Sequence, residues 1–384
     1  MGKKKLLMIT CDGGIAFGKQ NVFFEMLKDF SSHFERISII CPSNEIGKEI
    51  KIHNNVYLYP SGITRKFHLD FWLHKNFVVR KGLEIFKTYG FDLIDAHFLP
   101  PLLSQLRGGI QLSKLTNRPF ITEFMHLPGL PKSSCFQETF EKMVSIFFLK
   151  LYKKKIKDIR IINRGQVETY FKNQLHFRAE QLHFISSIYL DLDIFKQLHL
   201  DRKPNLFVTA GRLAQNKGLF LILDAILIVR DSGHHDIRLK IVGDGPLKNK
   251  LTRYIDKHRL KSHVELLGWL PTQRDVAQLY NSAKASIMAS YNEGGPRVVF
   301  ESMACGTPVL TTRVGETNEI IRDGFNGLFI DWNAQDIAEK ICYVLENPSK
   351  LEAMRIPAFE TVQAWEKKKV LSQYAQMLYK IMGT

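Results

Sequence analysis

The sequence has few of the features that mark exported or membrane-spanning proteins. Its 384 residues include only five cysteines, which are scattered and show no CxxC spacing, so the pattern argues against a disulfide framework or a structural zinc site. The most apolar runs, 144–152 and 220–229, are interrupted by Lys150 and Asp224 and fall well below the roughly 18 residues of a membrane span. The basic start MGKKKLLMIT is followed by too short an apolar stretch for a signal peptide. We therefore expect a soluble, cytoplasmic protein.

Acidic residues are scarce relative to basic ones, and the imbalance is uneven along the chain. The whole chain has 54 Lys and Arg against 38 Asp and Glu, a formal charge of +16. Residues 1–185 contribute 28 − 16 = +12 of this charge, with a dense lysine cluster at 150–157. A basic surface attracts nucleic acid phosphates or anionic lipid headgroups. An ordinary solvated helix end explains a single cluster equally well.

Short β-branched, apolar runs alternate with longer amphipathic stretches from one end of the chain to the other. This alternation is typical of βαβ units, in which a parallel sheet is covered by helices on both faces. The expected strands are 6–10, 37–41, 93–96, 120–122 and 159–162 in the first half, and 206–210, 239–242, 264–267, 285–288, 308–311 and 328–330 in the second. The sequence therefore predicts an α/β protein with two Rossmann-like, doubly wound, parallel-sheet domains.

The regular alternation breaks at 186–204, a stretch that ends in Arg-Lys-Pro, and we expect the linker there. The predicted domains are 1–185 and 205–363. The segment 364–384 has a helical pattern with no strand after it, and it is free to pack across to the first domain. Since doubly wound sheets bind ligands beyond the carboxyl ends of their strands, the deep site is expected in a cleft between the domains.

The strongest chemical signal is the segment 293–308, which reads EGGPRVVFESMACGTP. Pro296 suits the first position of a helix, and the free amides of Gly295, Arg297 and Val298 would then form an anion site at the positive end of the helix dipole. The carboxylates of Glu293 and Glu301 would accept hydrogen bonds from ligand hydroxyl groups. The alternative is an ordinary strand-loop-helix junction whose glutamates are solvated.

This segment resembles the signature of the retaining GT-B glycosyltransferases of family 4, the glycosyl transferases group 1. In that family two glutamates stand eight positions apart, as Glu293 and Glu301 do, and the pattern E-G-x-P…E-x-M-A-x-G-x-P-V is present almost whole. The resemblance implies that Glu293 contacts the transferred sugar and that Glu301 contacts the ribose hydroxyls of the nucleotide. Where many members have E-G-F-G, this chain has Gly294, Gly295 and Pro296, and the proline removes one amide donor.

Two further glycine-containing turns in the second half fit the same family order. The segment 209–218 reads TAGRLAQNKG, and it looks like the G-R-L…K-G element whose Arg and Lys bind the donor pyrophosphate, here Arg212 and Lys217 after Gly211. A guanidinium and an ammonium five residues apart can converge on one anion. The alternative is that both are ordinary basic residues on the surface. Gly243 and Gly245 lie in a strand-end turn that the resemblance places near the nucleotide base.

Only a few residues of the first half match the pattern of the family. Gly14 belongs to a Gly-Gly pair after the first strand, as in the family's glycine-rich loop, but the spacing is not the GxGxxG fingerprint of NAD binding. A family histidine that touches the donor sugar and phosphate matches His126 after 119–125 with imperfect spacing. His97 follows another expected strand and is the alternative, and a partly exposed neutral histidine explains either residue. We expect Glu293, His126, Arg212 and Lys217 to be the catalytic residues.

A literal DxD at Asp191 and Asp193 holds a divalent metal in another class of glycosyltransferases, but here it falls in the expected linker without neighbouring carboxylates. We therefore expect neither a metal nor another cofactor. The predicted function is transfer of a hexose-type sugar, with retention, from a UDP- or GDP-linked donor to a saccharide or lipid-linked saccharide acceptor in bacterial-type polysaccharide or glycolipid biosynthesis. The nucleotide-diphosphate sugar would be the co-substrate and would bind to the domain 205–363, while the acceptor would bind to the domain 1–185. The protein would lie on the inner face of the membrane as a peripheral protein.

The sequence is also compatible with other functions. Within the same fold, the chain could act on a small soluble acceptor or epimerise a nucleotide sugar. A basic nucleic-acid-binding protein is the rival from another class, but the sequence has no RNP-like aromatic strand, basic zipper or zinc finger. We accordingly expect no nucleic acid partner.

Overall fold

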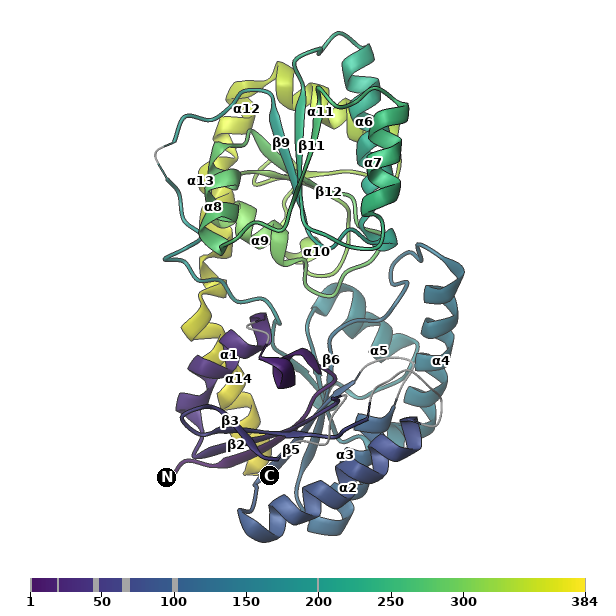
Figure 1. Ribbon diagram of the computed structural model, residues 1–384, viewed down its shortest axis with the longest axis vertical. Coiled ribbons are helices and arrows are strands. Elements are labelled where there is room, and N and C mark those ends of the chain that lie inside the picture. Colours follow the sequence, from purple (N-terminus) through teal and green to yellow (C-terminus); the bar gives the residue numbers. More distant parts are fainter. Residues whose placement is uncertain are drawn as a thin grey trace. The chain divides into compact units, whose positions relative to one another are not determined.

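The structure is a computed structural model that describes residues 2–18, 21–43, 48–63, 70–98, 103–198 and 200–383 (Figure 1). The chain divides into two compact units. The first comprises Met1–Leu127, Phe140–Ser187 and Lys368–Thr384, and the second comprises Pro128–Thr139 and Ile188–Lys367. This division differs from the expected domains, because a short segment from the first half joins the second unit and most of the expected linker is part of its compact body.

The first unit is built on an eight-stranded sheet with the order β3-β4-β2-β1-β5-β6-β7-β8. Every neighbouring pair is parallel except β3 with β4, which is antiparallel. The sequence patterns missed β3, which has two exposed positions, β8, which has three residues, and the mostly buried β4. The strands are β1 (Lys5–Ile9), β2 (Arg36–Cys41), β3 (Ile50–His53), β4 (Val56–Pro60), β5 (Leu93–Phe98), β6 (Phe120–Phe124), β7 (Asp158–Ile161) and β8 (Leu182–Phe184).

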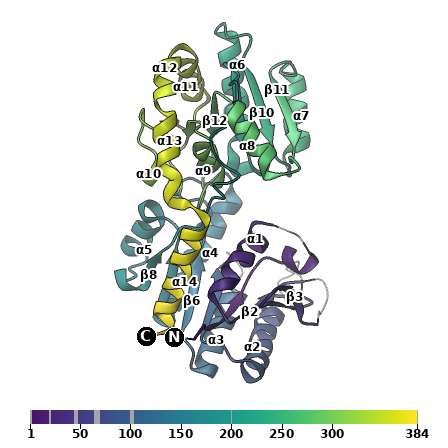
Figure 2. The ribbon, with the colours of Figure 1, turned by 90° about the vertical axis from the view of Figure 1, so that its left-hand side faces the viewer.

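Helices cover both faces of this sheet. On one face α2 and α3 pack against each other, and α1 and the C-terminal helix lie on the other (Figure 2). Phe30 of α1 stacks there on Tyr374 of the C-terminal helix, with ring centroids 4.8 Å apart. The central strands are buried on both faces, as a parallel sheet with two helical layers requires. The helices are α1 (Val22–Phe30), α2 (Asp70–Thr88), α3 (Ser104–Thr116), most of α4 (Phe136–Tyr152), α5 (Thr169–Asn173) and α14 (Lys367–Met382).

A buried polar network attaches α14 to the sheet of the first unit. The Tyr374 hydroxyl lies 2.7 Å from Oδ2 of Asp95 on β5 and hydrogen-bonds to Glu123 on β6. Arg160 of β7 donates a hydrogen bond to Glu123 at 2.6 Å. Its guanidinium carbon lies 4.0 Å from the centre of the Tyr374 ring. These four side chains come from segments far apart in sequence, so the network is a long-range tie between the C-terminal segment and the strands.

The surroundings of the two carboxyl groups in this network shift their pKa values in opposite directions. Burial, and then the charge of Glu123, raises the pKa of Asp95 well above its ordinary value. Burial acts in the same direction on Glu123, but the attraction of Arg160 outweighs it and holds the pKa of Glu123 below its ordinary value. The Tyr374 hydroxyl has one proton and can donate to only one carboxyl group at a time, so the raised pKa of Asp95 favours the form that can share a proton with its neighbours.

The second unit contains a six-stranded parallel sheet with the order β11-β10-β9-β12-β13-β14. All six strands fall within one or two residues of the expected positions. The strands are β9 (Leu206–Ala210), β10 (Arg238–Val242), β11 (Val264–Gly268), β12 (Ala285–Met288), β13 (Val309–Thr311) and β14 (Leu328–Phe329); the helices are α6 (Leu219–Asp231), α7 (Lys248–Lys257), α8 (Gln273–Ser282), α9 (Arg297–Ala304), α10 (Thr317–Ile320), α11 (Ala334–Glu346), α12 (Pro348–Ala353) and α13 (Arg355–Val362).

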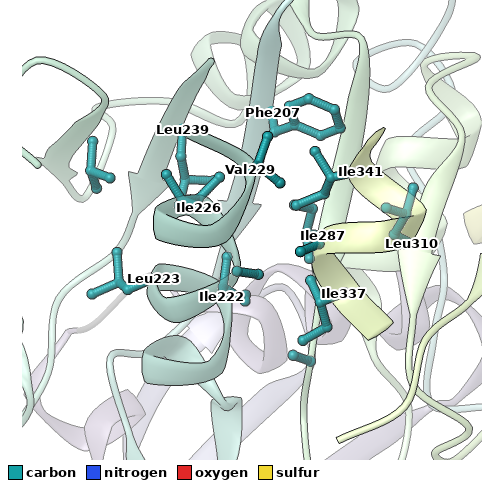
Figure 3. Close-up of a cluster of buried hydrophobic side chains, with 14 of the residues drawn as sticks. Phe207, Ile222, Leu223, Ile226, Val229, Leu239, Ile287, Leu310, Ile337 and Ile341 are labelled. Carbon is teal, nitrogen blue, oxygen red and sulfur yellow. The ribbon is translucent and has the colours of Figure 1, made fainter. Parts of the chain in front are cut away.

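Two apolar clusters hold the layers of the second unit together. On one face, α6 and α11 bury Ile226 and Ile341 against strand residues such as Phe207 (Figure 3). On the other face, α8, α9 and α13 pack on the sheet together with Ile188 and Phe195. Since those last two side chains are buried, residues of the expected linker 186–204 are part of the core of the second unit. The two units divide between Ser187 and Ile188, within two residues of the point where the βα pattern breaks, although the residues after that point are not a free linker.

Removing the Tyr374 hydroxyl tests the network in the first unit. We expect Tyr374→Phe to lower the free energy of opening of α14 and β5 by ~1–3 kcal/mol, because buried carboxyl groups lose a hydrogen-bond partner. Amide hydrogen exchange of the two segments measures this quantity. The matched control is Tyr89→Phe, which removes the hydroxyl of an exposed tyrosine and should change the value by less than ~0.5 kcal/mol. Equal effects of the two substitutions would contradict the role given to the network.

Candidate active site

The order of strands in the second unit creates a point where the connections diverge. The chain leaves β9 through α6, which lies on one face of the sheet, and it leaves the neighbouring strand β12 through α9, which lies on the other face. In doubly wound sheets a crevice forms at the carboxyl ends of two such strands, and ligands bind there. The expected site motifs at 209–218 and 293–301 follow β9 and β12, respectively, so both meet at this switch point.

An ion pair joins the two motifs across the switch point. Lys217 closes a short 3₁₀ helix, Gln215–Lys217, and its ammonium group is paired with a carboxylate oxygen of Glu293. The same oxygen accepts a 2.8 Å hydrogen bond from the hydroxyl of Ser290. The position depends on Gly218, whose φ of +63° is left-handed and where a Cβ would overlap the carbonyl oxygen of Ala289. The pairing therefore requires a close approach of the loops after β9 and β12.

A small pocket lies beside this ion pair. Its lining combines the strand ends of β9, β10 and β12 with both predicted cations of the first motif. The lining residues are Thr209, Ala210, Gly211, Arg212, Leu213, Lys217, Leu219, Ile241, Val242, Met288, Ser290 and Val298. Arg212 is exposed and has no ion-pair partner among the residues that the structure describes. The guanidinium is thus available for an anion, and Lys217 has two further N–H donors besides the one it directs to Glu293.

The helix after β12 begins one residue later than expected, and this changes the set of amide donors. Pro296 is the N-cap and α9 starts at Arg297. The amide of Arg297 donates to the carbonyl of Gly295 at 3.0 Å, so the prediction of a free Arg297 amide is wrong. A turn closed by Gly295 and Pro296 brings that carbonyl within reach of the amide. The Arg297 guanidinium instead donates to the carbonyl of Tyr189 at 2.7 Å.

The amides of Gly295 and Val298 remain the candidate donors at this helix end. Val298 also lines the pocket, which places the start of α9 beside Lys217 and Arg212. Gly294 lies under the left-handed turn at Gly315, where an added Cβ would meet the carbonyl oxygens of Gly294 and Glu293. The glycines of this loop therefore permit close backbone packing as well as any ligand contact.

Glu301 lies inside α9 and is only 8% exposed. Burial raises the pKa of Glu301 to about 7, although the charge of Arg297 acts in the opposite direction. A buried carboxyl group with no obligatory partner in the core is costly to ionise, which makes this residue hard to explain by packing alone. It is well placed to gain hydrogen bonds from hydroxyl groups of a bound molecule.

Gly211, Gly243 and Gly245 form a close-packed backbone layer at the ends of β9 and β10. The amide of Gly211 donates to the carbonyl of Val242, and the amide of Gly243 donates to Gly268 at 2.8 Å. At Gly243, where φ is +129°, a Cβ would overlap the carbonyl oxygen of Gly211. The structure thus gives these glycines a role in bringing the strand ends together, and Gly211 also lines the pocket.

The predicted residues of the first unit gather at its own switch point, between β1 and β5. Thr10, at the end of β1, lies 3.1 Å from Nδ1 of His97 on β5, and His126 follows the adjacent strand β6. The amide of Gly14 is already engaged, because it donates to the Asp12 carboxylate at 2.8 Å. Burial lowers the pKa of His97 against the attraction of Glu123, so this imidazole is neutral at neutral pH. The choice between His126 and His97 as the donor-contacting histidine stays a prediction.

A metal ion has one geometrically possible position in the described part of the chain. Ligand atoms of Asp95, His97 and Glu123 lie within 4.8 Å of one another. Glu123, however, already bonds Arg160 and Tyr374, so a guanidinium supplies the positive charge that this carboxylate needs. At the literal DxD, Asp191 instead accepts the amide of Asp193 at 3.1 Å, which is a local turn contact.

Sequence reasoning missed several residues that shape these sites. Ser290 orients Glu293, and Asn292 donates to the Lys132 carbonyl and to Glu138, which attaches the segment 128–139 to the second unit. Ser290 stands three residues before Glu293, but a lone serine gives no signal of its contact. The link from Asn292 to Glu138 spans 154 positions, and no local pattern could have revealed it.

Comparison with known proteins identifies the second unit. Residues 191–360 match the family model of the glycosyl transferases group 1. The chain carries a glycosyl transferases group 1 domain. A glycosyltransferase of Methanocaldococcus jannaschii described as uncharacterized, MJ1178, is 28% identical over 340 residues, which cover 87% of this chain and 85% of the relative. The resemblance stated from the 293–308 segment is thereby confirmed at the level of group 1.

Solved structures show the same fold over nearly the whole chain. Sucrose-phosphate synthase from Thermosynechococcus elongatus has a TM-score of 0.81 at 17% identity, covering 99% of this chain and 100% of the other. Anabaena Alr3699/HepE, solved in complex with UDP and glucose, has a TM-score of 0.74 at 19% identity, covering 98% and 99%. The predicted GT-B architecture with two parallel-sheet α/β domains is confirmed.

The buried carboxyl group of Glu301 generates a pH-dependent prediction. Its pKa is about 7 in the folded chain and 4.5 in the unfolded chain, so ionisation destabilises the fold progressively as the pH rises from about 4.5 to about 7. We expect Glu301→Gln to be stabilising, and its gain over the wild type to be ~2 kcal/mol larger at pH 8 than at pH 5. Chemical denaturation at both pH values measures the difference. A gain that does not depend on pH would show that Glu301 is not held in an apolar site.

Proposed function

We propose that this group 1 glycosyltransferase transfers a hexose-type sugar from a nucleoside-diphosphate sugar to a hydroxyl group, with retention at the anomeric carbon. The observation that carries the proposal is the convergence of Arg212, Lys217 and Glu293 at the switch point of the second unit. Two cations beside one carboxylate suit a ligand that is anionic at one end and rich in hydroxyl groups at the other. A nucleotide sugar has this composition.

The residues of the second unit would stabilise charge as the donor breaks. The bond between the anomeric carbon and the diphosphate oxygen breaks, a bond from that carbon to the acceptor oxygen forms, and the acceptor proton passes to the departing phosphate. Lys217 and Arg212 would hold the diphosphate throughout, together with the amides at the start of α9. Preorganised cations and amides directed at developing negative charge are typically the largest catalytic contribution in such sites. No metal ion is needed for this arrangement of charges.

The remaining predicted residues receive complementary roles. Glu293, oriented by Lys217 and Ser290, would accept hydrogen bonds from the sugar hydroxyls. Glu301 would accept the ribose hydroxyls, and the gain of those bonds would offset the cost of ionising a buried carboxyl group. His126, with His97 as the alternative, would contact the donor sugar and phosphate from the first unit, near Gly14. UDP is the preferred nucleotide, because HepE, the neighbour described above, was solved with UDP.

The acceptor we propose is a saccharide or a lipid-linked saccharide of polysaccharide or glycolipid assembly, met at the inner face of the membrane. The support is electrostatic, since residues 1–185 carry a formal charge of 28 − 16 = +12 while the rest of the chain carries 26 − 22 = +4. Anionic headgroups and diphosphate-linked lipids attract such a surface. A small soluble acceptor would not need it.

A panel of nucleotide sugars tests the proposed function. We expect one of UDP-, GDP- or ADP-sugars to raise the melting temperature of the wild-type protein and to be hydrolysed slowly without an acceptor. Product analysis by NMR should show release of the nucleoside diphosphate and a sugar, with the α or β configuration of the donor retained on transfer.

Two outcomes of the panel would contradict the proposal. Conversion of the donor to an epimer without release of the diphosphate would identify a nucleotide-sugar epimerase. Failure of every donor to bind, together with a gel shift of nucleic acid that survives moderate salt, would favour a nucleic-acid-binding protein.

A further inference from the structure

Helix α4 of the first unit exposes an apolar stripe to solvent. Phe136, the first residue of the helix, is 81% exposed, and four large side chains further along it are also more than half exposed: Phe140 at 51%, Met143 at 55%, Phe147 at 62% and Leu151 at 59%. They are separated by three or four positions, which places them on one side of the helix. No other helix in the described ranges exposes as many large apolar side chains.

The buried side of α4 accounts for how the helix is held. Ser145 and Leu149 are fully buried, so the helix packs on its unit through the face that bears these two residues. The hydroxyl of Ser145 bonds back to the carbonyl of Glu141 at 2.5 Å, which leaves it no need for a partner elsewhere. The exposed stripe therefore does not contribute to the core, and a packing role for it would require another surface.

Positive charge flanks the apolar stripe. Residues 140–157 contain six lysines and one acidic residue, Glu141. Lys150, in the last turn of α4, is exposed, and so is Lys154 in the 3₁₀ helix Lys153–Lys155 that follows directly. The rings of Tyr152 and Phe177 lie 5.6 and 5.7 Å from the ammonium groups of Lys155 and Lys153, which keeps the stems of these lysines against the protein surface.

A helix with an apolar face bordered by lysines is suited to lie in the plane of a membrane interface. Apolar side chains enter the boundary between headgroups and acyl chains, while lysine stems extend to bring their ammonium groups to anionic phosphates. None of the helices in the described ranges has the length and apolar character needed to cross a membrane. The chemistry of α4 therefore matches attachment to one leaflet.

We propose that the exposed face of α4, formed by Phe140, Met143, Phe147, Leu151 and the lysines at 150–157, docks on an anionic lipid bilayer. This inference rests on the proposed function, because it names the surface through which a lipid-linked acceptor would be reached. The lysines at 150–157 are complementary in charge to anionic headgroups, and this favours a lipid bilayer as the partner of the exposed face. A second copy would bring residues 1–185, with their formal charge of +12, against the same positively charged residues, which opposes association.

Sedimentation with lipid vesicles tests the docking surface. The wild-type protein is mixed with vesicles of phosphatidylcholine alone and of phosphatidylcholine with phosphatidylglycerol, at low and at high salt. We expect strong binding only to the anionic vesicles at low salt, since salt screens the headgroup charge. Equal binding to both vesicles at low salt would overturn the proposal.

Two sets of substitutions separate the apolar and the charged contributions. Lys150→Gln with Lys154→Gln and Lys155→Gln should weaken binding to anionic vesicles on the order of a hundredfold, at about a tenfold or less for each lysine. Met143→Ser with Phe147→Ser and Leu151→Ser should weaken it at least about tenfold through lost apolar burial. All six positions are surface positions, and circular dichroism of each variant verifies that the fold is retained.

Matched controls come from exposed residues outside the face. Leu115→Ser with Ile356→Ser removes two exposed apolar side chains, and Lys257→Gln with Lys261→Gln and Lys350→Gln removes three exposed lysines. Both controls should bind vesicles as the wild type does. Loss of binding in the controls equal to that in the α4 variants would overturn the assignment to this face.

The readouts keep this proposal separate from the proposed function. Thermal shift by the nucleotide sugar should be the same in all variants, because none of the substituted residues belongs to the donor site. Vesicle binding without any nucleotide-sugar binding would leave the docking face standing and remove the glycosyl transfer. An apolar α4 variant that keeps full vesicle binding but lowers the oligomeric state in analytical ultracentrifugation would show that a second copy covers the face.

Discussion

The site depends on the approach of two loops that leave the sheet of the second unit toward opposite faces. The ion pair between Lys217 and Glu293 can form only because β9 and β12 are neighbours in the sheet while their following helices, α6 and α9, lie on different faces. Each partner also requires a glycine-permitted turn, at Gly218 before α6 and at Gly315 under the 293–295 loop. Sheet order, helix placement and turn chemistry thus converge on one pair of charges.

Local patterns in the sequence were sufficient to predict much of this arrangement. Buried parallel strands are short apolar runs, so all six strands of the second unit could be predicted. The motif residues Arg212, Lys217, Glu293 and Glu301 lie in the loops that follow β9 and β12 or in the helix after β12. The exposed antiparallel strand β3 lacks an apolar pattern and was missed. Arg297 was misjudged because whether an amide is free depends on the turn before it, and residue identity does not fix that turn.

Long-range contacts were beyond the reach of sequence patterns. The bond from Tyr374 to Asp95 spans 279 positions, and the protonation of Asp95 depends on the charges of Glu123 and Arg160 around it. The same limit applies to α4, whose apolar and basic residues are visible in the sequence but whose exposure is visible only in the fold. Buried carboxyl groups occur in both units. Charges from other strands act on Asp95 and Glu123, whereas burial and the charge of Arg297 on the same helix act on Glu301.

The most direct test of the proposed site measures whether Arg212 and Lys217 bind the diphosphate of the donor. Isothermal titration calorimetry would compare UDP with uridine, or the matching pair selected by the donor panel, on the wild type and on Arg212→Ala with Lys217→Ala. The account predicts that the double variant loses at least about a hundredfold in affinity for the diphosphate, because two charge-assisted contacts are worth ~1.5–3 kcal/mol each, while affinity for the nucleoside is unchanged. An unchanged affinity for the diphosphate, or an equal loss for the nucleoside, would contradict it.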